Sequence, residues 1–284
     1  MRILVTGAAG MLGTEVCRQA SERHEVFATT ASTLDVGRHD VVFCEFDRLR
    51  PDVAIHLAAW TDVDGCERDP DRAYRVNTLG TQNVALACQR RDIPLIFLSS
   101  IAVFDGDSLE PYTEFDTPNP RSVYGRSKYQ AELTIQSLLR RYYIVRAGWM
   151  FGSGERDKKF VGKILQRARE SSELRVVDDK FGSPTYTVDL ARALERLVES
   201  GLYGVFHIVN SGGAPSRFDL ANFILECAGI TSCRAIPVSS ADFTLPAPRP
   251  RMEAARMLRL ELLGLNWMRP WPDALREYLS HLEP

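Results

Sequence analysis

Residues 1–13, MRILVTGAAGMLG, decide the fold. A short apolar run at residues 3–5 leads into Gly7, Gly10 and Gly13, spaced three apart, and an amphipathic stretch begins near Met11. In a strand–turn–helix of this kind, one glycine permits the tight turn, one lets the backbone approach a pyrophosphate, and one lets the helix pack closely on the strand. The N-terminus of the helix offers free N–H groups and a positive dipole end to the phosphates. The stretch therefore predicts a dinucleotide-binding turn.

The first 150 residues alternate short apolar runs with longer amphipathic stretches. The predicted strands cover residues 3–5, 26–28, 53–57, 95–98 and 143–146, and predicted helices begin near Met11, Asp71 and Val123, with a further one beyond this region near Phe160. Near-continuous apolar strands separated by helices are typical of a parallel sheet covered on both faces. We therefore expect an α/β, doubly wound (Rossmann) NAD(P)-binding domain over residues 1–150.

The pattern becomes less regular after about Gly148. Strand-like residues 174–177 and 205–209 alternate with helical residues 188–199 and 218–228, residues 245–251 (LPAPRPR) are a Pro-rich loop, and a last helix covers about 272–281. Residues 151–284 are expected to form mainly a smaller C-terminal α/β substrate lobe, with segments that return to the Rossmann domain.

The composition of the chain indicates which classes of binding partner and which cellular compartment to expect. The net charge is -2 and no run of Lys or Arg occurs, which argues against a nucleic-acid or membrane-surface partner. The six cysteines lie at irregular spacings without a C-x-x-C pair, and no His/Cys/carboxylate cluster has metal-ligand spacing. No apolar stretch is long enough for a signal segment or a membrane span. We expect a cytoplasmic protein with reduced thiols, a small-molecule substrate and no catalytic metal.

The end of the predicted second strand bears on the choice of dinucleotide. An acidic residue there would bind a ribose 2′-hydroxyl and repel a 2′-phosphate. Residues 27–32 (FATTAS) contain no carboxylate but several hydroxyls, which favours NADPH, while the lack of an Arg in this stretch leaves NADH possible. Asp35, a few residues later, is expected near the adenine.

A phenol and an ammonium lie four residues apart at Tyr124 and Lys128, on one face of a predicted helix. When a hydride adds to a carbonyl carbon, the oxygen needs a proton, which a Tyr can deliver if a nearby Lys lowers the pKa of the phenol. A hydroxyl to polarise the carbonyl is available from Ser99 and Ser100, which follow the strand at 95–98. The combination predicts carbonyl reduction.

These features resemble the extended short-chain dehydrogenase/reductases and, within them, the dTDP-4-dehydrorhamnose reductase family. The resemblance covers nearly the whole chain and implies NADPH-dependent reduction of the C4 ketone of a nucleotide-linked 4-keto-6-deoxysugar. Its further segments are residues 56–64 (HLAAWTDVD), Cys66-Glu67, Val76-Asn77, 103–106 (VFDG), 146–152 (RAGWMFG), 178–185 (DDKFGSPT) and Arg249-Pro250.

The resemblance implies roles for individual residues. Ser100 would polarise the carbonyl, Tyr124 would protonate it, and Lys128 would support Tyr124 and the cofactor. Asn77 would help to hold the active-site helix and a relay water, and Trp149 would lie against the sugar or base. The predicted substrate residues are Ser100, Trp149 and Thr185, and the predicted cofactor residues are Gly7, Gly10, Met11, Leu12, Gly13, Thr30, Asp35, Val36, Leu57, Ala58, Ala59, Thr61, Asn77, Ser99, Tyr124, Lys128 and Gly148.

Two departures from the family's pattern leave the sugar and the nucleotide open. Ile101-Ala102 stand where the family usually has Asp-Tyr, and residues 251–253 (RME) also differ. Because Ile101 and Ala102 cannot transfer protons, the sequence argues against a 4,6-dehydratase. An NAD-dependent sugar-nucleotide epimerase and a non-catalytic NADP-binding regulatory subunit stay as alternatives, and a homodimer is possible.

Overall fold

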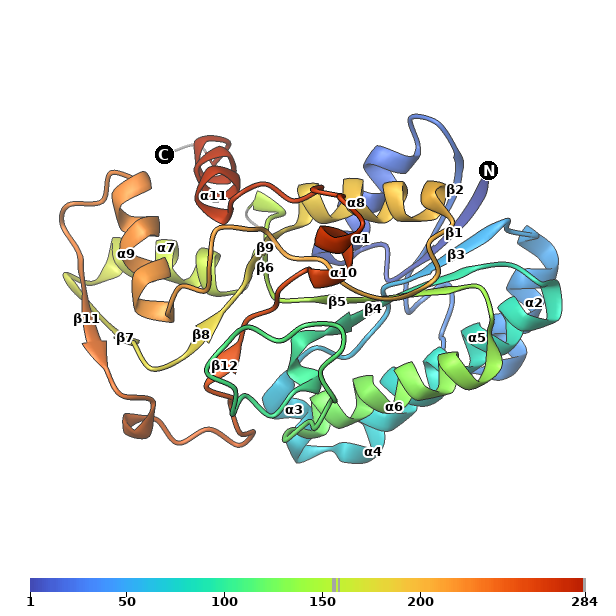
Figure 1. Cartoon of the computed structure of the whole chain (residues 1–284), viewed down its shortest axis with the longest axis horizontal. Helices are drawn as coiled ribbons and strands as arrows, with labels where there is room; N and C mark the ends of the chain where they lie inside the picture. Colours follow the sequence, from blue (N-terminus) through green and yellow to red (C-terminus); the bar gives the residue numbers. More distant parts are fainter. Residues whose placement is uncertain (155–156, 158, 283–284) are drawn as a thin grey trace.

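A six-stranded parallel sheet forms the larger part of the molecule (Figure 1). The computed structural model describes residues 1–154, 157 and 159–282. Neighbouring strands lie in the order β10-β5-β4-β3-β1-β2, and every pairing is parallel. The strands are β1 (Arg2–Thr6), β2 (Glu25–Thr29), β3 (Val53–His56), β4 (Leu95–Ser100), β5 (Tyr142–Ala147) and β10 (Gly204–His207).

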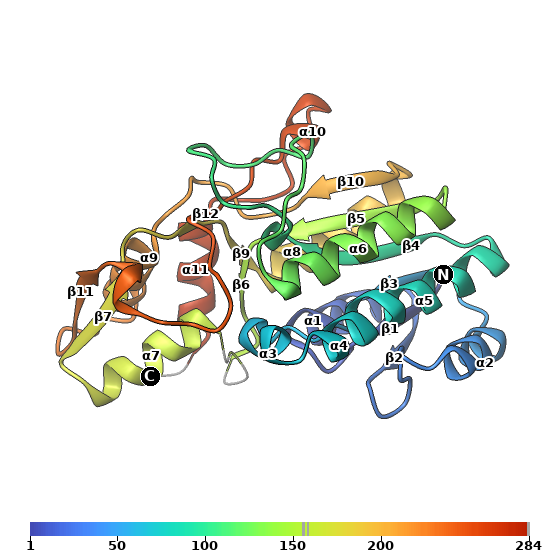
Figure 2. The same ribbon diagram turned by 90° about the horizontal axis from the view of Figure 1, so that it is seen from below.

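Helices cover both faces of this sheet because successive side chains of a strand point to opposite faces. On β1, Ile3 and Val5 pack in one core cluster with helices α1 (Met11–Ala20) and α8 (Thr187–Ser200). Leu4 packs in a second cluster with the helices of the other face, α2 (His39–Leu49), α5 (Gly80–Arg91) and α6 (Val123–Leu138). Figure 2 shows α5 and α6 side by side along this second face. The predicted doubly wound Rossmann fold is confirmed.

A smaller α/β lobe with its own apolar core lies beside the sheet (Figure 1). Its strands pair two by two: β11 (Arg234–Val238) with β7 (Glu173–Val177), β12 (Met252–Glu253) with β8 (Phe181–Gly182), and β6 (Trp149–Phe151) with β9 (Pro184–Tyr186). The helices are α7 (Phe160–Glu170), α9 (Arg217–Cys227) and α11 (Trp271–Ser280). α8 and β10 return to the large sheet, and the short α10 (Leu258–Leu262) packs beside β10.

Some elements differ from the sequence-based expectation. The helix expected from Asp71 is three consecutive segments, α4 (Pro70–Ala73), a π-helical turn η1 (Tyr74–Leu79) and α5. Among the described helices, α2, α3 (Val63–Arg68) and α10 have no counterpart among the predictions. No described helix is long and apolar enough to cross a bilayer.

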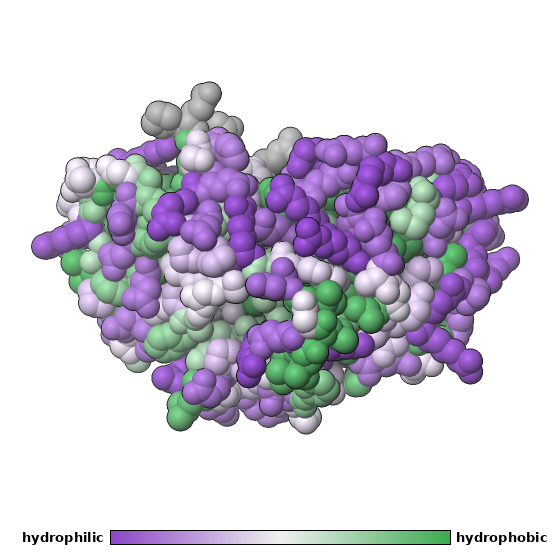
Figure 3. Space-filling model, turned by 45° about the horizontal axis from the view of Figure 1, so that its top comes forward, coloured by the Kyte–Doolittle hydropathy of each residue, from purple (hydrophilic) through white to green (hydrophobic). Residues whose placement is uncertain are grey.

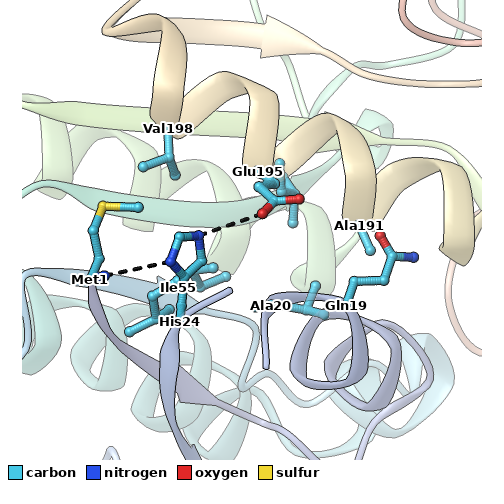
Figure 4. A pocket seen from close by; sticks show the side chains of 11 residues that line it. Met1, Gln19, Ala20, His24, Ile55, Ala191, Glu195 and Val198 are labelled. Carbon is cyan, nitrogen blue, oxygen red and sulfur yellow. Dashed lines mark hydrogen bonds and ion pairs between the residues drawn. The ribbon is translucent and has the colours of Figure 1, made fainter. Parts of the chain in front are cut away.

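One apolar pocket lies between α1 and α8, at the end of the sheet where β1 begins (Figure 4). Its lining includes Ala20, Ile55 and Val198, and the His24 ring lies 3.5 Å from both the Met1 amino group and a Glu195 carboxylate oxygen. Ligands of doubly wound sheets bind at the opposite, carboxyl edge. The pocket is therefore a packing gap between helices, and the site has to be sought at the other edge.

Candidate active site

The glycine turn has the geometry that a dinucleotide requires. Gly7 has a φ of 71°, in the left-handed region, and a Cβ there would lie 2.7 Å from the Ala58 nitrogen. A Cβ on Gly13 would overlap the carbonyl oxygen of Gly7, so this glycine lets α1 pack against the turn. Gly10 is exposed and is the N-cap of α1. Gly7 thus makes the tight turn and Gly13 allows the close packing that the sequence predicts, whereas the approach of a pyrophosphate to Gly10 stays a prediction.

The N-terminus of α1 can receive a phosphate group. Among the described residues no side chain caps this helix, and its first turn contains no acidic residue. Met11 is partly exposed, whereas the Leu12 side chain is buried, so Leu12 can contact a ligand here only through its backbone. Free N–H groups at the carboxyl edge of the sheet fit a pyrophosphate.

The segment after β3 forms the neighbouring wall of the turn. The Ala58 N–H donates to Thr6 Oγ1 over 3.3 Å, and Leu57, Ala58 and Ala59 are all partly exposed. Thr61 is exposed, and its hydroxyl oxygen accepts a hydrogen bond from Lys159 Nζ at 3.3 Å. Four of the predicted cofactor residues therefore lie together beside the glycine turn.

Hydroxyl groups gather after β2. Thr30 Oγ1 lies 2.9 Å from Ser32 Oγ, and the Thr30 N–H donates to Thr33 Oγ1 over 2.9 Å. Asp35 is exposed and accepts a hydrogen bond from the Gly37 N–H, whereas Val36 is buried. A partly open cluster of hydroxyls can donate to phosphate oxygens.

Ser100 and Tyr124 meet where β4 ends and α6 begins. Ser122 caps α6 by accepting a hydrogen bond from the Gly125 N–H at 3.1 Å. A Cβ on Gly125 would overlap the Ala102 carbonyl oxygen, so this glycine allows the first turn of α6 to lie against the segment after Ser100. Burial raises the pKa of Tyr124 to about 12, although a hydrogen bond with the Ser100 side chain acts in the opposite direction.

Lys128 lies one turn further along α6 and is 2% exposed. Its Nζ lies 4.0 Å from the centroid of the Phe97 ring. Burial lowers the pKa of Lys128 to about 7, against the opposing influence of Glu132. The expectation that Lys128 lowers the pKa of Tyr124 is not met in this structure, because burial outweighs the other influences on the phenol.

Ser99 and Ser100 point to different environments. Ser99 is buried and its hydroxyl donates to Glu132, whose carboxylate also forms a 2.6 Å ion pair with Arg146. Ser100 is partly exposed beside Tyr124. Of the two, Ser100 is the hydroxyl that a substrate can reach, whereas direct contact of Ser99 with the cofactor stays a prediction.

Asn77 joins the segment after β3 to α6. It is buried in η1, where its Oδ1 accepts from the Trp60 N–H at 2.8 Å and its Nδ2 donates to Ser127 Oγ at 3.0 Å. The Ser127 hydroxyl donates in turn to the Tyr124 carbonyl. The structure therefore supports the implied role of Asn77 in holding the active-site helix.

Trp149 begins the smaller lobe and faces two residues that the sequence analysis did not assign to the site. Its Nε1 donates to a Glu253 carboxylate oxygen at 3.1 Å, and the Arg217 guanidinium lies 3.4 Å above its ring. Burial lowers the pKa of Arg217 to about 10. Arg217 and Glu253 lie 68 and 104 residues after Trp149 in the sequence. The one signal in the sequence for either of them is that residues 251–253 differ from the family's pattern.

Four further positions were singled out by the sequence. A Cβ on Gly148 would overlap the Ser183 carbonyl oxygen. Thr185 is fully buried and its hydroxyl donates to the same carbonyl at 3.3 Å, so its contact with substrate stays a prediction. Ile101 is buried in the core beside Ser100, and Ala102 has no polar group, so neither offers substrate a polar side chain.

Within the described part of the chain, no group of His, Cys, Asp or Glu side chains could hold a metal ion.

Known proteins are similar in sequence to nearly the whole chain. The family described as RmlD substrate binding domain matches residues 1–283. The chain is 39% identical to dTDP-4-dehydrorhamnose reductase of Mycobacterium tuberculosis, over 98% of this chain and 92% of the relative. It is 36% identical to the spore coat polysaccharide biosynthesis protein SpsK of Bacillus subtilis, over 98% and 97% of the two chains.

Solved structures of dTDP-4-dehydrorhamnose reductases are similar to this chain over nearly its whole length. The dTDP-4-dehydrorhamnose reductase of Bacillus anthracis in complex with NADP superposes with a TM-score of 0.94 at 34% identity, over 98% of both chains. The orthologue from Clostridium acetobutylicum gives 0.95 at 37% identity, over 99% of both. A Thermus thermophilus UDP-glucose 4-epimerase reaches 0.83 at 22% identity, over 99% of this chain and 98% of the epimerase, which shows a shared fold alone.

Proposed function

Because the chain belongs to the RmlD substrate binding domain family, we propose that it reduces the C4 ketone of a nucleotide-linked 4-keto-6-deoxysugar with NADPH. The observation that carries this proposal is the placement of Ser100, Tyr124 and the buried Lys128 together at the carboxyl edge of the sheet. The reductase names of the relatives, and the NADP bound by one of the similar structures, support it.

The cofactor fits the residues beside the glycine turn. The N-terminus of α1 would hold the pyrophosphate, and the hydroxyls of Thr30, Ser32 and Thr33 would meet a 2′-phosphate. The described part of the loop that Thr30 opens carries no carboxylate before Asp35, so a 2′-phosphate meets no like charge there, and NADH is possible as a weaker donor. The same proposal assigns the cofactor to residues 1–150 and the sugar mainly to residues 151–284, with α8 and β10 returning to the sheet.

The protein's own residues then handle the proton. Ser100 donates a hydrogen bond to the ketone oxygen, and Tyr124, which stays protonated at neutral pH because its pKa is raised to about 12, transfers its proton to that oxygen. The nicotinamide, when bound, supplies the hydride that the ketone carbon accepts. The Lys128 ammonium then lies on the same helix face as the phenolate that is formed, which favours the transfer.

A Tyr124→Phe variant tests the role of the phenol. We expect kcat for NADPH oxidation to fall roughly 100-fold or more, because the proton donor is lost, while NADPH affinity, measured by fluorescence titration, stays within about twofold. Tyr142→Phe, the same chemical change at the first residue of β5, serves as the control. A Tyr124→Phe enzyme with wild-type turnover would show that the proton comes from elsewhere.

The substrate is tested with dTDP-, GDP-, UDP- and CDP-linked 4-keto-6-deoxysugars. The proposal predicts one NADPH oxidised per alcohol formed with at least one of them. Inversion at C4 without net NADPH oxidation would instead identify an epimerase. A panel without any turnover, together with a protein captured in a pull-down, would identify a regulatory subunit.

Two further properties belong to the same proposal. A homodimer is supported by hydrophobic side chains that gather on one face around α10 (Figure 3), where Leu262 and Leu263 are 73% and 48% exposed. Light scattering during size-exclusion chromatography tests it directly. A cytoplasmic location is supported by the six cysteines, all of them unpaired thiols, and fractionation of the cells tests it.

A further inference from the structure

A carboxylate from the last third of the chain, that of Glu253, lies beside Trp149. Glu253 lies in the short strand β12, where it pairs with Gly182 of β8, and the Ser183 N–H donates to its carbonyl oxygen. Its side chain is partly exposed, and one carboxylate oxygen accepts the 3.1 Å hydrogen bond from Trp149 Nε1. The backbone pairing thus fixes where the carboxylate sits.

The Trp149 indole is held on several sides. The Arg217 guanidinium lies 3.4 Å above its ring, and a Cβ on Gly182 would overlap the indole. With Glu253 bonded to its N–H, the ring has little freedom to turn. A rigid aromatic wall with a carboxylate at its edge is a common way to recognise a sugar, since the ring packs on C–H groups and the carboxylate accepts hydrogen bonds from hydroxyls.

The charge of this carboxylate acts on both the phenol and the guanidinium of the site. The negative charge of Glu253 contributes to the raised pKa of Tyr124 and acts against the lowered pKa of Arg217. The geometry behind this is the Trp149 ring, whose N–H donates to Glu253 and whose face lies 3.4 Å from the Arg217 guanidinium. Among the described residues, Trp149 Nε1 is the one donor to this carboxylate, so further acceptor positions are available to a ligand.

The side next to Ser100 offers the sugar no such group. Ile101 is buried and Ala102 ends in a methyl group, so polar recognition near the reacting carbonyl has to come from another element. In a 4-keto-6-deoxyhexose, the ring carbons beside the carbonyl are C3, which can carry a hydroxyl, and C5, which carries the methyl group and the ring oxygen. A carboxylate near Tyr124 therefore has one natural partner on the sugar.

We propose that Glu253 is a specificity-determining residue that accepts a hydrogen bond from the C3 hydroxyl of the substrate while it holds Trp149 against the sugar ring. This inference rests on the proposed function, because it takes the ketone at Tyr124 to be C4 of a hexose. The enzyme then selects ketosugars with a free C3 hydroxyl over 3-deoxy analogues.

The test compares two substrates and three variants of the full-length protein. Glu253→Gln and Glu253→Ala are assayed with the preferred nucleotide-linked 4-keto-6-deoxysugar and with its 3-deoxy analogue. Glu173→Gln is the control, because Glu173 is paired with Arg234 on the surface. A hydrogen bond between a hydroxyl and a charged acceptor predicts a loss in kcat/KM of roughly 10- to 100-fold for Glu253→Ala with the hydroxylated sugar, mainly through KM, and a smaller loss for Glu253→Gln.

The 3-deoxy analogue decides between recognition and general damage. We expect the wild type to use the 3-deoxy analogue poorly. With this analogue, kcat/KM of the Glu253 variants should be less than about threefold below that of the wild type, and their NADPH affinity, measured by fluorescence titration, should be unchanged. An equal loss with both sugars, or no loss with either, would overturn the inference while leaving the reductase intact. If the wild-type protein oxidises NADPH with none of the nucleotide-linked ketosugars, the proposed function itself falls, and this inference with it.

Discussion

Replacing Gly7 by Ala separates two effects that are usually mixed at a glycine turn. Gly7 has a φ of 71°, and a Cβ there would lie 2.7 Å from the Ala58 nitrogen, whereas ordinary contact begins at 3.4 Å. The segment after β3 would thus have to move by 0.7 Å, the difference between these two distances. Gly201, at the end of α8, has a φ of 66° and nothing within 4 Å of an added Cβ. It therefore carries the conformational cost without the clash.

The two costs can be estimated separately. A left-handed backbone costs an L-residue about 1–2 kcal/mol, and overpacking adds about 1–3 kcal/mol. Gly201→Ala should therefore lower the free energy of unfolding by the first amount alone, and Gly7→Ala by the sum of about 2–5 kcal/mol. At roughly 2–4 °C per kcal/mol for a chain of this size, thermal unfolding followed by circular dichroism resolves the difference.

Cofactor binding gives the second readout. Because the clash lies in the wall of the turn, Gly7→Ala should also weaken NADPH binding by at least roughly tenfold, an effect of about 1.4 kcal/mol, whereas Gly201→Ala should leave it unchanged. Fluorescence titration measures both. Equal losses of stability with equal NADPH affinities in the two variants would refute the assignment of Gly7 to the cofactor turn.

Two buried charges lead to further predictions. The pKa of Lys128 is lowered to about 7, so the unfolded chain binds a proton that the folded chain has lost between about pH 7 and 10, and stability should rise with pH across that window by up to about 1.4 kcal/mol per unit. Lys128→Met should remove this slope, which urea titrations at several pH values measure. In the wild type kcat/KM should fall above about pH 7, as the Lys128 ammonium loses its proton. Glu132→Gln should cost about 3–5 kcal/mol because it leaves the buried Arg146 without its partner charge. Glu45→Gln, which breaks the more exposed pair with Arg48, should cost less than about 1 kcal/mol, and similar losses in these two variants would contradict the reasoning.

The sequence predicted the parts of the molecule that depend on local patterns. A strand buried on both faces has to be apolar at every position, which is why β1, β3 and β4 were visible as short apolar runs. The positions of Tyr124 and Lys128 on one helix face follow from their spacing of four. Helix α2 was missed because charged residues near both of its ends interrupt its apolar residues, so few turns repeat the amphipathic pattern.

Other features depend on contacts between distant segments. Glu253 meets Trp149 because β12 pairs with β8, and no spacing in the sequence announces a two-residue strand. The pKa of Lys128 is set by its burial beside Phe97, and the raised pKa of Tyr124 has the same origin. Residue types alone predicted a lowered pKa for Tyr124, whereas the structure raises it. The prediction considered the charge of the neighbouring Lys128 but not the loss of water around the buried phenol.

A buried chain of hydrogen bonds explains how the two halves of the site stay in register. The Thr6 hydroxyl, under the glycine turn, lies 2.7 Å from His56 Nδ1, and His56 Nε2 lies 3.0 Å from Thr81 Oγ1, which donates to the Asn77 carbonyl. Burial lowers the pKa of His56 to about 3, so the ring is neutral at physiological pH and can accept at one nitrogen while it donates from the other.

Through Asn77 this chain continues to Ser127 and the backbone of Tyr124. The turn that holds the dinucleotide and the helix that carries the phenol are therefore positioned by one connected set of buried bonds. Ile101 and Ala102, which follow Ser100 on the side of the sugar, take no part in this set of bonds. Residues at these two positions can therefore change without altering the distance between the cofactor and the proton donor. On this reasoning the reductive chemistry and the choice of sugar are separate properties of the structure, and the second is where Glu253 acts.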